Sequence, residues 1–227
     1  MTRFTGRPLK PLSSRPSTPA EVEADRAHLG SMIRIWGTSL IVLGLFALFG
    51  PGLLEFPPVI DPLWGILAIS LGLASLWLKH AALLAGEAVF LGGQGLLLAI
   101  GGLQFNQATG DTLILAIGIL LAVYALRLWG GVQRARRLPN APADGFALAG
   151  IVGALVGMAI SGAAFLVSTE QHSAFVRYGL DLSLLALGLS LGALLLGTDC
   201  PGLGKIGLGL SLLALIAFLA ILFFNRA

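Results

Sequence analysis

Residues 35–54 read IWGTSLIVLGLFALFGPGLL, a run of twenty residues without a charged side chain. A helix needs about 20 apolar residues to cross the hydrocarbon of a bilayer. Predominantly apolar runs recur along the chain, roughly at residues 63–78, 81–105, 113–132, 146–168, 178–197 and 203–224. The sequence therefore predicts an all-α fold, a polytopic transmembrane helix bundle of about seven spans.

The second run is short and meets the third at Lys79–His80, so a six-span arrangement is the alternative. Seven spans are preferred because residues 63–105 form too long a segment for one crossing. Spans one to six pair in chain order as three helical hairpins, and the seventh helix is left over. An odd number of crossings places the two ends of the chain on opposite sides of the membrane.

The composition supports the same class of protein. The chain has 227 residues, of which 56% are hydrophobic and 11% charged, and its mean hydropathy is +0.91. Soluble domains carry roughly 25% charged residues. The basic side chains lie beside apolar spans, so nucleic acid is not expected as a partner. Cys200 is the single cysteine and the three histidines are scattered, so no disulfide, metal site or other cofactor is predicted.

Residues 1–30 differ from the rest of the chain in being polar and rich in Pro, Ser and Arg. We expect a disordered or partly helical cytoplasmic tail there, with a short polar helix near Thr18–His28. Thr18 and Glu21 are spaced for a capping box, and Pro19 suits the first helical position. Residues 31–227 are expected to form one transmembrane helical domain.

Lysine and arginine are distributed unevenly between the two sides that this topology defines. With the N-terminus inside, twelve of the 14 basic residues fall in inside segments, and only Arg177 and Arg226 fall outside. The positive-inside rule therefore predicts a cytoplasmic N-terminus and an outside C-terminus. The expected location is a bacterial plasma membrane or an internal photosynthetic membrane, with the lipid bilayer as the immediate partner.

The first two spans align without gaps at an offset of 28 residues, with Ile35-Trp-Gly and Leu43-Gly-Leu matching Leu63-Trp-Gly and Leu71-Gly-Leu. Either duplication or the low complexity of Leu/Gly/Ala sequence accounts for this match. A Pro-containing turn joins these Gly-rich spans, and LRLW precedes a basic loop in 126–137. In these features residues 35–197 resemble the HdeD-type acid-resistance membrane proteins. The resemblance implies about six helices in repeated hairpins, a role in acid or envelope stress, and no catalytic residue.

His80, Glu87 and Gln94 recur every seven residues in the third span, with Gly101 continuing the series. These positions share one helix face. An acid inside a span is costly and faces protein or water. Because Arg127 of the fourth span reaches a similar depth, we expect a structural Glu87–Arg127 pair, so that Glu87→Gln costs folding or assembly. A protonatable site or cation pathway is the alternative interpretation. 

Arg177 and Asp181 lie near the outer end of the sixth span at i,i+4 spacing. Oppositely charged side chains at this spacing are neighbours on a helix surface. The spacing predicts an ion pair at the membrane interface, and a contact with substrate is the alternative.

Small residues recur at strict four-residue spacing in the fifth span, and the sixth span adds two glycines. The positions are Gly145, Ala149, Gly153, Gly157, Ser161, Gly188 and Gly192. Small residues let helix backbones approach closely in lipid. Packing within the chain is the preferred interpretation, and a seam in a homo-oligomer or a larger membrane complex is the alternative.

Two enzyme motifs occur literally in the sequence and are discounted. The segment 188–192, GLSLG, matches G-x-S-x-G but lies inside an apolar span instead of on a strand-to-helix turn. The segment 202–207, GLGKIG, matches G-x-G-x-x-G, but no strand precedes it. Its glycines are expected to form the tight turn after residues 199–201.

Three classes of function remain. The preferred class is a non-enzymatic membrane protein that acts by association, as a stress-related or accessory subunit of HdeD-like type. The alternative is a small transporter or channel that uses the polar stripe of the third span. An intramembrane enzyme is disfavoured because acid, base and nucleophile do not converge.

Overall fold

The computed structural model describes residues 18–54, 62–109, 112–138, 142–163 and 169–224. These residues form seven α-helices and no strand: α1 (Pro19–Leu54), α2 (Pro62–Leu78), α3 (Ala81–Thr109), α4 (Leu113–Ala135), α5 (Asp144–Ala163), α6 (Thr169–Leu196) and α7 (Pro201–Phe224). Six of them are long and apolar enough to cross a membrane, and α2, with 17 residues, is the shorter one. The chain is a multi-pass integral membrane protein, as the sequence predicted.

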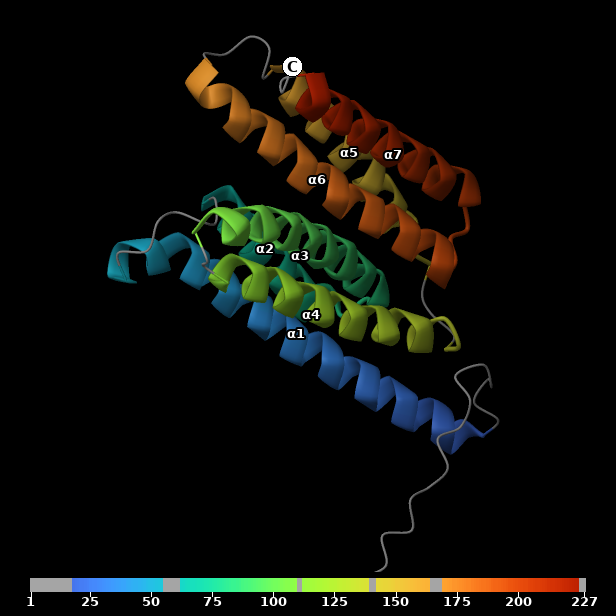
Figure 1. The fold of residues 1–227 in the computed structure, drawn as a ribbon. Helices are drawn as coiled ribbons and strands as arrows, with labels where there is room; N and C mark the ends of the chain where they lie inside the picture. Colours follow the sequence, from blue (N-terminus) through green and yellow to red (C-terminus); the bar gives the residue numbers. More distant parts are fainter. Residues whose placement is uncertain (1–17, 55–61, 110–111, 139–141, 164–168, 225–227) are drawn as a thin grey trace, which may run out of the picture.

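The helices lie side by side in two groups (Figure 1). The first group contains α1 to α4 and the second contains α5 to α7, and the two meet where α3 packs against α6. Within the groups, α1 pairs with α2, α3 with α4 and α5 with α6, while α7 packs on both α5 and α6. The predicted arrangement of three helical hairpins plus one helix is therefore confirmed.

The 28-residue repeat has a direct counterpart in the α1–α2 hairpin. A Cβ added to Gly37 would lie 3.0 Å from the carbonyl oxygen of Gly72, and one added to Gly44 would lie 2.6 Å from that of Gly65. Because α1 and α2 are antiparallel, the first glycine of the motif in each helix faces the second glycine of the motif in the other helix. The repeated motif thus makes a self-complementary contact in which backbones touch without intervening side chains.

α1 is one continuous helix of 36 residues, about 54 Å long, whereas the bilayer hydrocarbon measures about 30 Å. The charged residues of this helix all lie in its first part, residues 19–34, which extends past the apolar spans. The Thr18 hydroxyl oxygen accepts the N–H of Glu21 at 3.3 Å, which is the Thr18 half of the predicted capping box. The expected short helix near Thr18–His28 is correspondingly the beginning of α1 and not a separate element.

The α2–α3 connection consists only of Lys79 and His80. Lys79 has a φ of 49°, in the left-handed region that ends helices and reverses the chain. The N–H of Lys79 still bonds to the carbonyl oxygen of Ser75 at 3.1 Å, which closes the last turn of α2. Residues 63–105 therefore form two separate helices, as predicted, of which α3 is long enough to cross a membrane and α2 is shorter.

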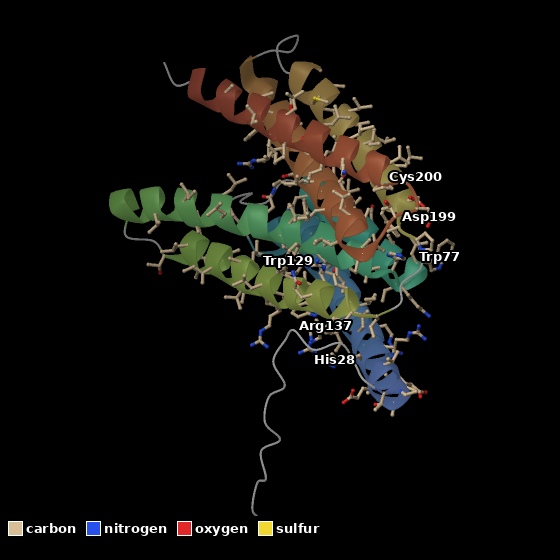
Figure 2. All side chains as sticks on the ribbon, turned by 90° about the vertical axis from the view of Figure 1, so that its right-hand side faces the viewer. His28, Trp77, Trp129, Arg137, Asp199 and Cys200 are labelled. Atoms are coloured by element: carbon tan, nitrogen blue, oxygen red, sulfur yellow. The ribbon has the colours of Figure 1, made fainter. Side chains whose placement is uncertain are left out.

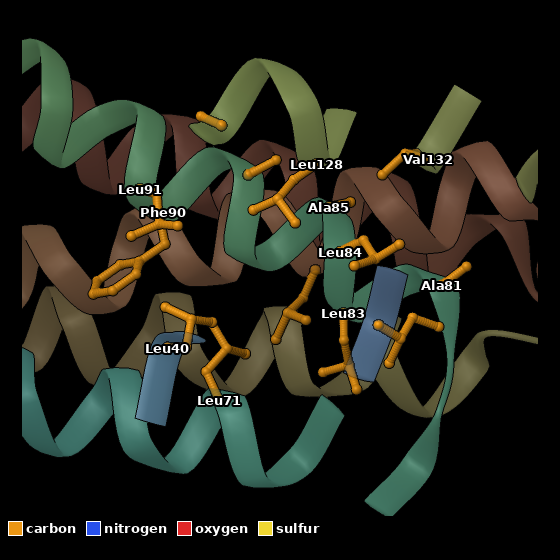
Figure 3. Close-up of a cluster of buried hydrophobic side chains, with 14 of the residues drawn as sticks. Leu40, Leu71, Ala81, Leu83, Leu84, Ala85, Phe90, Leu91, Leu128 and Val132 are labelled. Atoms are coloured by element: carbon orange, nitrogen blue, oxygen red, sulfur yellow. The ribbon is translucent and has the colours of Figure 1, made fainter. Parts of the chain in front are cut away.

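The largest buried apolar cluster surrounds the first half of α3 (Figure 3). Leu84 and Phe90 of α3 are fully buried, and they pack among residues from α1, α2 and α4. Trp64 of α2 stacks on Phe90 with ring centroids 5.9 Å apart. α3 is therefore the central helix of its group, covered by three neighbours on that side and by α6 on the other.

The small residues of α5 pack against α6 along a different line from the predicted one. Gly145 and Ala149 are exposed and Gly153 is half-buried, whereas Gly157 and Ser161 are buried. Four residues turn a helix by about 400°, so a strict four-residue series moves about 40° around it at each step. The prediction is therefore wrong for Gly145 and Ala149. The observed line alternates steps of three and four, through Ala147, Gly150, Ala154, Gly157 and Ser161.

Gly188 and Gly192 of α6 pack within the chain, but their partner is α3. A Cβ on Gly188 would lie 2.7 Å from the carbonyl oxygen of Ala85, and one on Gly192 would lie 2.8 Å from that of Ala82. α6 thus uses one small-residue line for α3 and another for α5. Through this double contact α6 joins the three-helix group to the four-helix group.

One end of the bundle carries most of the described charges, and we call it the basic end. It contains the α2–α3, α4–α5 and α6–α7 connections and the overhanging start of α1. Figure 2 looks on to this end and labels His28, Trp77, Arg137, Asp199 and Cys200 there. Its exposed basic residues include Arg26, Arg34, Lys79, Arg127, Arg134, Arg136 and Lys205.

Candidate functional site

Two polar pairs from three helices lie inside the bundle, and we call their four residues the polar seam. They are Ser75 of α2, Glu87 and Gln94 of α3, and Asp181 of α6. Ser75 and Glu87 are 0% exposed and Asp181 is 1% exposed. Burial of such groups inside membrane spans is costly unless the protein provides hydrogen bonds, so their partners define what the seam does.

Glu87 receives a hydrogen bond across the α2–α3 hairpin. The Ser75 hydroxyl donates to its Oε1 atom, while Oε2 has no hydrogen-bond partner among the described residues. The short connection at Lys79–His80 places Ser75, in the last turn of α2, beside the second turn of α3. The seam therefore offers a buried carboxyl group with one oxygen held by the fold and one oxygen open to another donor.

Asp181 joins the two helix groups. The side-chain amide of Gln94 donates a hydrogen bond to its Oδ1 atom. The helices approach closely because glycines line their contact: a Cβ on Gly93 would lie 2.6 Å from a methyl carbon of Leu184. This hydrogen bond is a specific polar link between α3 and α6 in an otherwise small and apolar interface.

The predicted Glu87–Arg127 pair is wrong. Arg127 lies at the expected depth, because Ala125 of α4 contacts Gly92 of α3 and Leu84 contacts Gly131. Its side chain is nevertheless exposed. The buried face of α4 runs instead through Gly118, Leu121, Ala125, Leu128, Gly131, Val132 and Ala135. Each residue turns the helix by about 100°, and Arg127, which precedes the buried Leu128, lies off this face.

The predicted four-residue stripe is shorter than expected. His80 lies in the α2–α3 connection, where its Nδ1 atom accepts the N–H of Ala82 at 3.1 Å and its ring lies 4.6 Å from that of Phe146. Gly101 is exposed, and a Cβ there would meet nothing within 4 Å. Of the stripe, only Glu87 and Gln94 belong to the polar seam.

The prediction for the sixth span placed Asp181 in an interfacial ion pair with Arg177. Asp181 is buried, however, and bonds to Gln94 of another helix, whereas Arg177 is exposed. Asp181 therefore lies at a helix–helix contact that the prediction did not include. One signal of the α6 contact was present in the sequence, since Gly93 lies beside Gln94 and faces Leu184 of α6, and such a glycine indicates a close neighbouring helix.

The two literal enzyme motifs are parts of helices. Ser190 is buried against Gly150 and Gly207, and its hydroxyl oxygen has no hydrogen-bond partner in the described part of the chain. The segment 202–207 belongs to the first turns of α7, so its predicted place in a tight turn is wrong. The turn lies earlier, at Gly197, where φ is 102°.

Asp144, which sequence analysis did not single out, holds this turn in place. Its two carboxylate oxygens accept the N–H groups of Asp199 at 3.3 Å and Cys200 at 3.0 Å. An acidic side chain at the start of a helix satisfies free N–H groups and interacts favourably with the helix dipole. The start of α5 is thereby tied to the start of α7.

The chemistry that the polar seam can support is limited to hydrogen bonding and proton or cation binding. In the part of the chain that the structure describes, no group of three or more His, Cys, Asp or Glu residues is arranged to hold a metal ion. No protein-family model, curated protein or solved structure matches this chain. The fold and the seam define the class: a multi-pass helical membrane protein with a buried polar contact between two helix groups.

Proposed function

We propose that this chain is a non-enzymatic membrane protein that acts by association, as an accessory subunit related to stress and of HdeD-like type. One observation carries the proposal. The polar seam is engaged by the protein's own hydrogen bonds, whereas the outward surface contains small residues that pack against nothing in the chain. Each acid of the seam is thus bound by a side chain of the protein, and the outer surface is available to a partner.

We assign the contact with this partner to the outward surface of α5. Gly145 and Ala149 are exposed, and the neighbouring Val152 is 52% exposed. In a membrane, small residues on an outer helix face permit close approach of a further helix. A second copy of the chain or a subunit of a larger complex would fit this face.

Purification from native membranes in a mild detergent tests the association. A tagged full-length chain is expected to bring down one stoichiometric membrane partner or to elute as a homo-oligomer. Gly145→Trp should release it. Gly209→Trp on α7, where the glycine is also exposed with nothing within 4 Å, is the matched control and should retain it. A monomer without a partner in the wild type would contradict the proposal.

We also infer a bacterial plasma membrane with the basic end in the cytoplasm, on the positive-inside rule. Cys200 provides a native probe, since it is the only cysteine, is exposed and lies at the basic end. A membrane-impermeant maleimide should label Cys200 in inverted vesicles or lysed cells but not in intact cells. Labelling of intact cells would reverse the inferred orientation.

A small transporter or channel is the second candidate, favoured by one observation. Oε2 of Glu87 has no hydrogen-bond partner among the described residues, and the arginine expected to neutralise this acid faces outward. Intramembrane acids are common in ion and proton pathways. Such a pathway would pass Glu87 at the contact of α2 and α3.

Flux measurements in proteoliposomes separate the two candidates. Under the association proposal, wild type and Glu87→Gln conduct neither protons nor small cations above empty liposomes. Under the transport alternative, the wild type conducts and Glu87→Gln abolishes the flux while remaining folded. Ser190→Ala is the control for a buried polar change outside the seam and should leave any flux intact.

A further inference from the structure

The outward face of α4 has an unusual order of side chains. Residues at strict seven-residue spacing lie almost in line along a helix. On this line Leu113 and Leu120 are 48% and 54% exposed, and Arg127 and Arg134, which follow, are both exposed. The line is therefore apolar in the half of α4 that is remote from the basic end, and it carries two arginines in the half that is near it.

Neither arginine on this line has a polar partner in the part of the chain that the structure describes. The nearby arginines differ, since Arg34 donates to the carbonyl oxygen of Gly30 at 3.3 Å and Arg136 donates to Gln133 at 3.4 Å. Arg127 lies eight residues before the end of α4, a distance of about 12 Å along the helix. A lipid-facing guanidinium at that depth is costly unless an anion or water reaches it.

Gly130 leaves room between the two arginines. It follows Arg127 by three positions and precedes Arg134 by four, so all three share one face of α4. A Cβ added at Gly130 would meet nothing within 4 Å. The surface thus lacks a side chain between two guanidinium groups, and we call this place the notch; an anionic group can approach the helix there.

We propose that Arg127 and Arg134 bind the phosphate of an anionic phospholipid, seated over Gly130. Guanidinium groups bind phosphate oxygens in pairs of charge-assisted hydrogen bonds. An acyl chain would then lie along Leu120 and the adjacent Val123 and Leu126, which are 47% and 72% exposed. The order of side chains on this face matches the order of a phospholipid, with the head group toward the basic end and the tail toward the membrane centre.

Charge favours a lipid over a second copy of the chain. A two-fold dimer through this face would bring the arginines of one copy toward those of the other, which is unfavourable. Further basic residues at the same end, Lys79 and Lys205, are also exposed and raise the positive potential there. An anionic lipid supplies the missing negative charge from the membrane itself.

Lipid titration of the full-length protein in a neutral detergent tests this site. Phosphatidylglycerol and phosphatidylcholine with the same acyl chains are added, and bound lipid is counted by native mass spectrometry. The wild type should bind phosphatidylglycerol in preference to phosphatidylcholine. Each of Arg127→Gln and Arg134→Gln should weaken that binding roughly fivefold, and the double variant about 25-fold, with further weakening by salt.

Matched variants separate this site from general attraction to a basic protein. Arg177→Gln removes an exposed arginine of α6 outside this face and should change nothing. Gly130→Leu should weaken phosphatidylglycerol binding by filling the notch, whereas Gly209→Leu on α7 should not. Equal binding by the double variant and the wild type would overturn the proposal, as would equal losses in Arg177→Gln.

Two further outcomes identify a different occupant. If inorganic phosphate displaces phosphatidylglycerol at the concentration of the lipid itself, the site recognises free phosphate and the lipid proposal is wrong. If the wild-type preparation contains a stoichiometric membrane protein that the Arg127→Gln preparation lacks, the face is a protein interface. Neither outcome depends on the α5 surface. The lipid site on α4 and the association through α5 are therefore tested independently of each other.

Discussion

Glu87 of α3 and Arg127 of α4 lie at the same level on neighbouring antiparallel helices, yet their surroundings are opposite. Glu87 is 0% exposed and bonds to Ser75, whereas Arg127 faces outward from the bundle. The two helices that carry them, α3 and α4, are in direct backbone contact at Gly95 and Gly118. Small residues therefore decide which face of each helix turns inward, and the attraction between the two charges does not.

This difference separates two kinds of position in a membrane bundle. At an inward position the neighbouring backbone is close and every polar atom needs a partner within the protein. At an outward position lipid adapts to the side chain, and a long cationic group reaches the head groups. Substitutions at inward and outward positions of similar depth test whether the two kinds of position differ in this way.

The largest effect is expected for Gly118→Leu, on the inward face of α4. A Cβ there would lie 2.5 Å from the backbone nitrogen of Ala99 and 2.8 Å from the carbonyl oxygen of Gly95. Because backbone cannot rotate away as a side chain does, we expect a loss of about 3 kcal/mol or failure to assemble. Gly130→Leu, on the outward face of the same helix, should stay within about 0.5 kcal/mol. Thermal unfolding in neutral detergent measures both, and similar losses would show that the two faces are wrongly assigned.

A smaller effect is expected for Gln94→Leu, which removes the amide that bonds to Asp181 between the helix groups. Loss of a donor to a buried carboxylate costs about 2 kcal/mol. The comparison is Gln133→Leu on α4, where the amide oxygen accepts from exposed Arg136 and the expected loss is below about 0.5 kcal/mol. Chemical denaturation in detergent gives the two values. Equal losses would mean that the Gln94–Asp181 bond adds nothing to the contact of the two groups.

Depth and helix number could be predicted from the sequence, because both follow from hydropathy and length. The level of Glu87 relative to Arg127 is an example, since each helix rises about 1.5 Å per residue from its boundary. Rotation about the helix axis could not be predicted in the same way. In α5 the four-residue series that begins at Gly145 moves around the helix. The packing of α6 buries Gly150 instead of Gly145, and the sequence of α5 alone does not show this.

The partners of the polar seam were also beyond prediction from the sequence. Ser75 bonds to Glu87 only because Lys79 reverses the chain in two residues, and Gln94 meets Asp181 across 87 positions of sequence. Charge complementarity suggested arginine partners for both acids. The fold instead provides an uncharged hydroxyl from Ser75 and an uncharged amide from Gln94.

A more modest effect is expected for Ser75→Ala, which leaves Oε1 of Glu87 without the Ser75 hydroxyl that donates to it. An unsatisfied buried acceptor costs about 1.5 kcal/mol. Ser190→Ala is the matched control, because Ser190 is equally buried but its hydroxyl oxygen has no hydrogen-bond partner within the described residues. Removal of that hydroxyl should be neutral or slightly stabilising. If thermal unfolding in detergent ranks the two variants in the opposite order, the Ser75–Glu87 bond does not stabilise the hairpin.

The smallest effect on folding is expected for Arg127→Gln, which tests directly whether Arg127 and Glu87 interact. If the arginine neutralised Glu87 inside the bundle, its removal would cost about 3–5 kcal/mol. Because Arg127 is exposed, we expect a change within about 0.5 kcal/mol in neutral detergent without anionic lipid. A double-mutant cycle with Glu87→Gln should give an interaction energy near zero. A coupling above about 1 kcal/mol would place the guanidinium beside the acid after all, and the assignment of the α4 face to lipid would then fail with it.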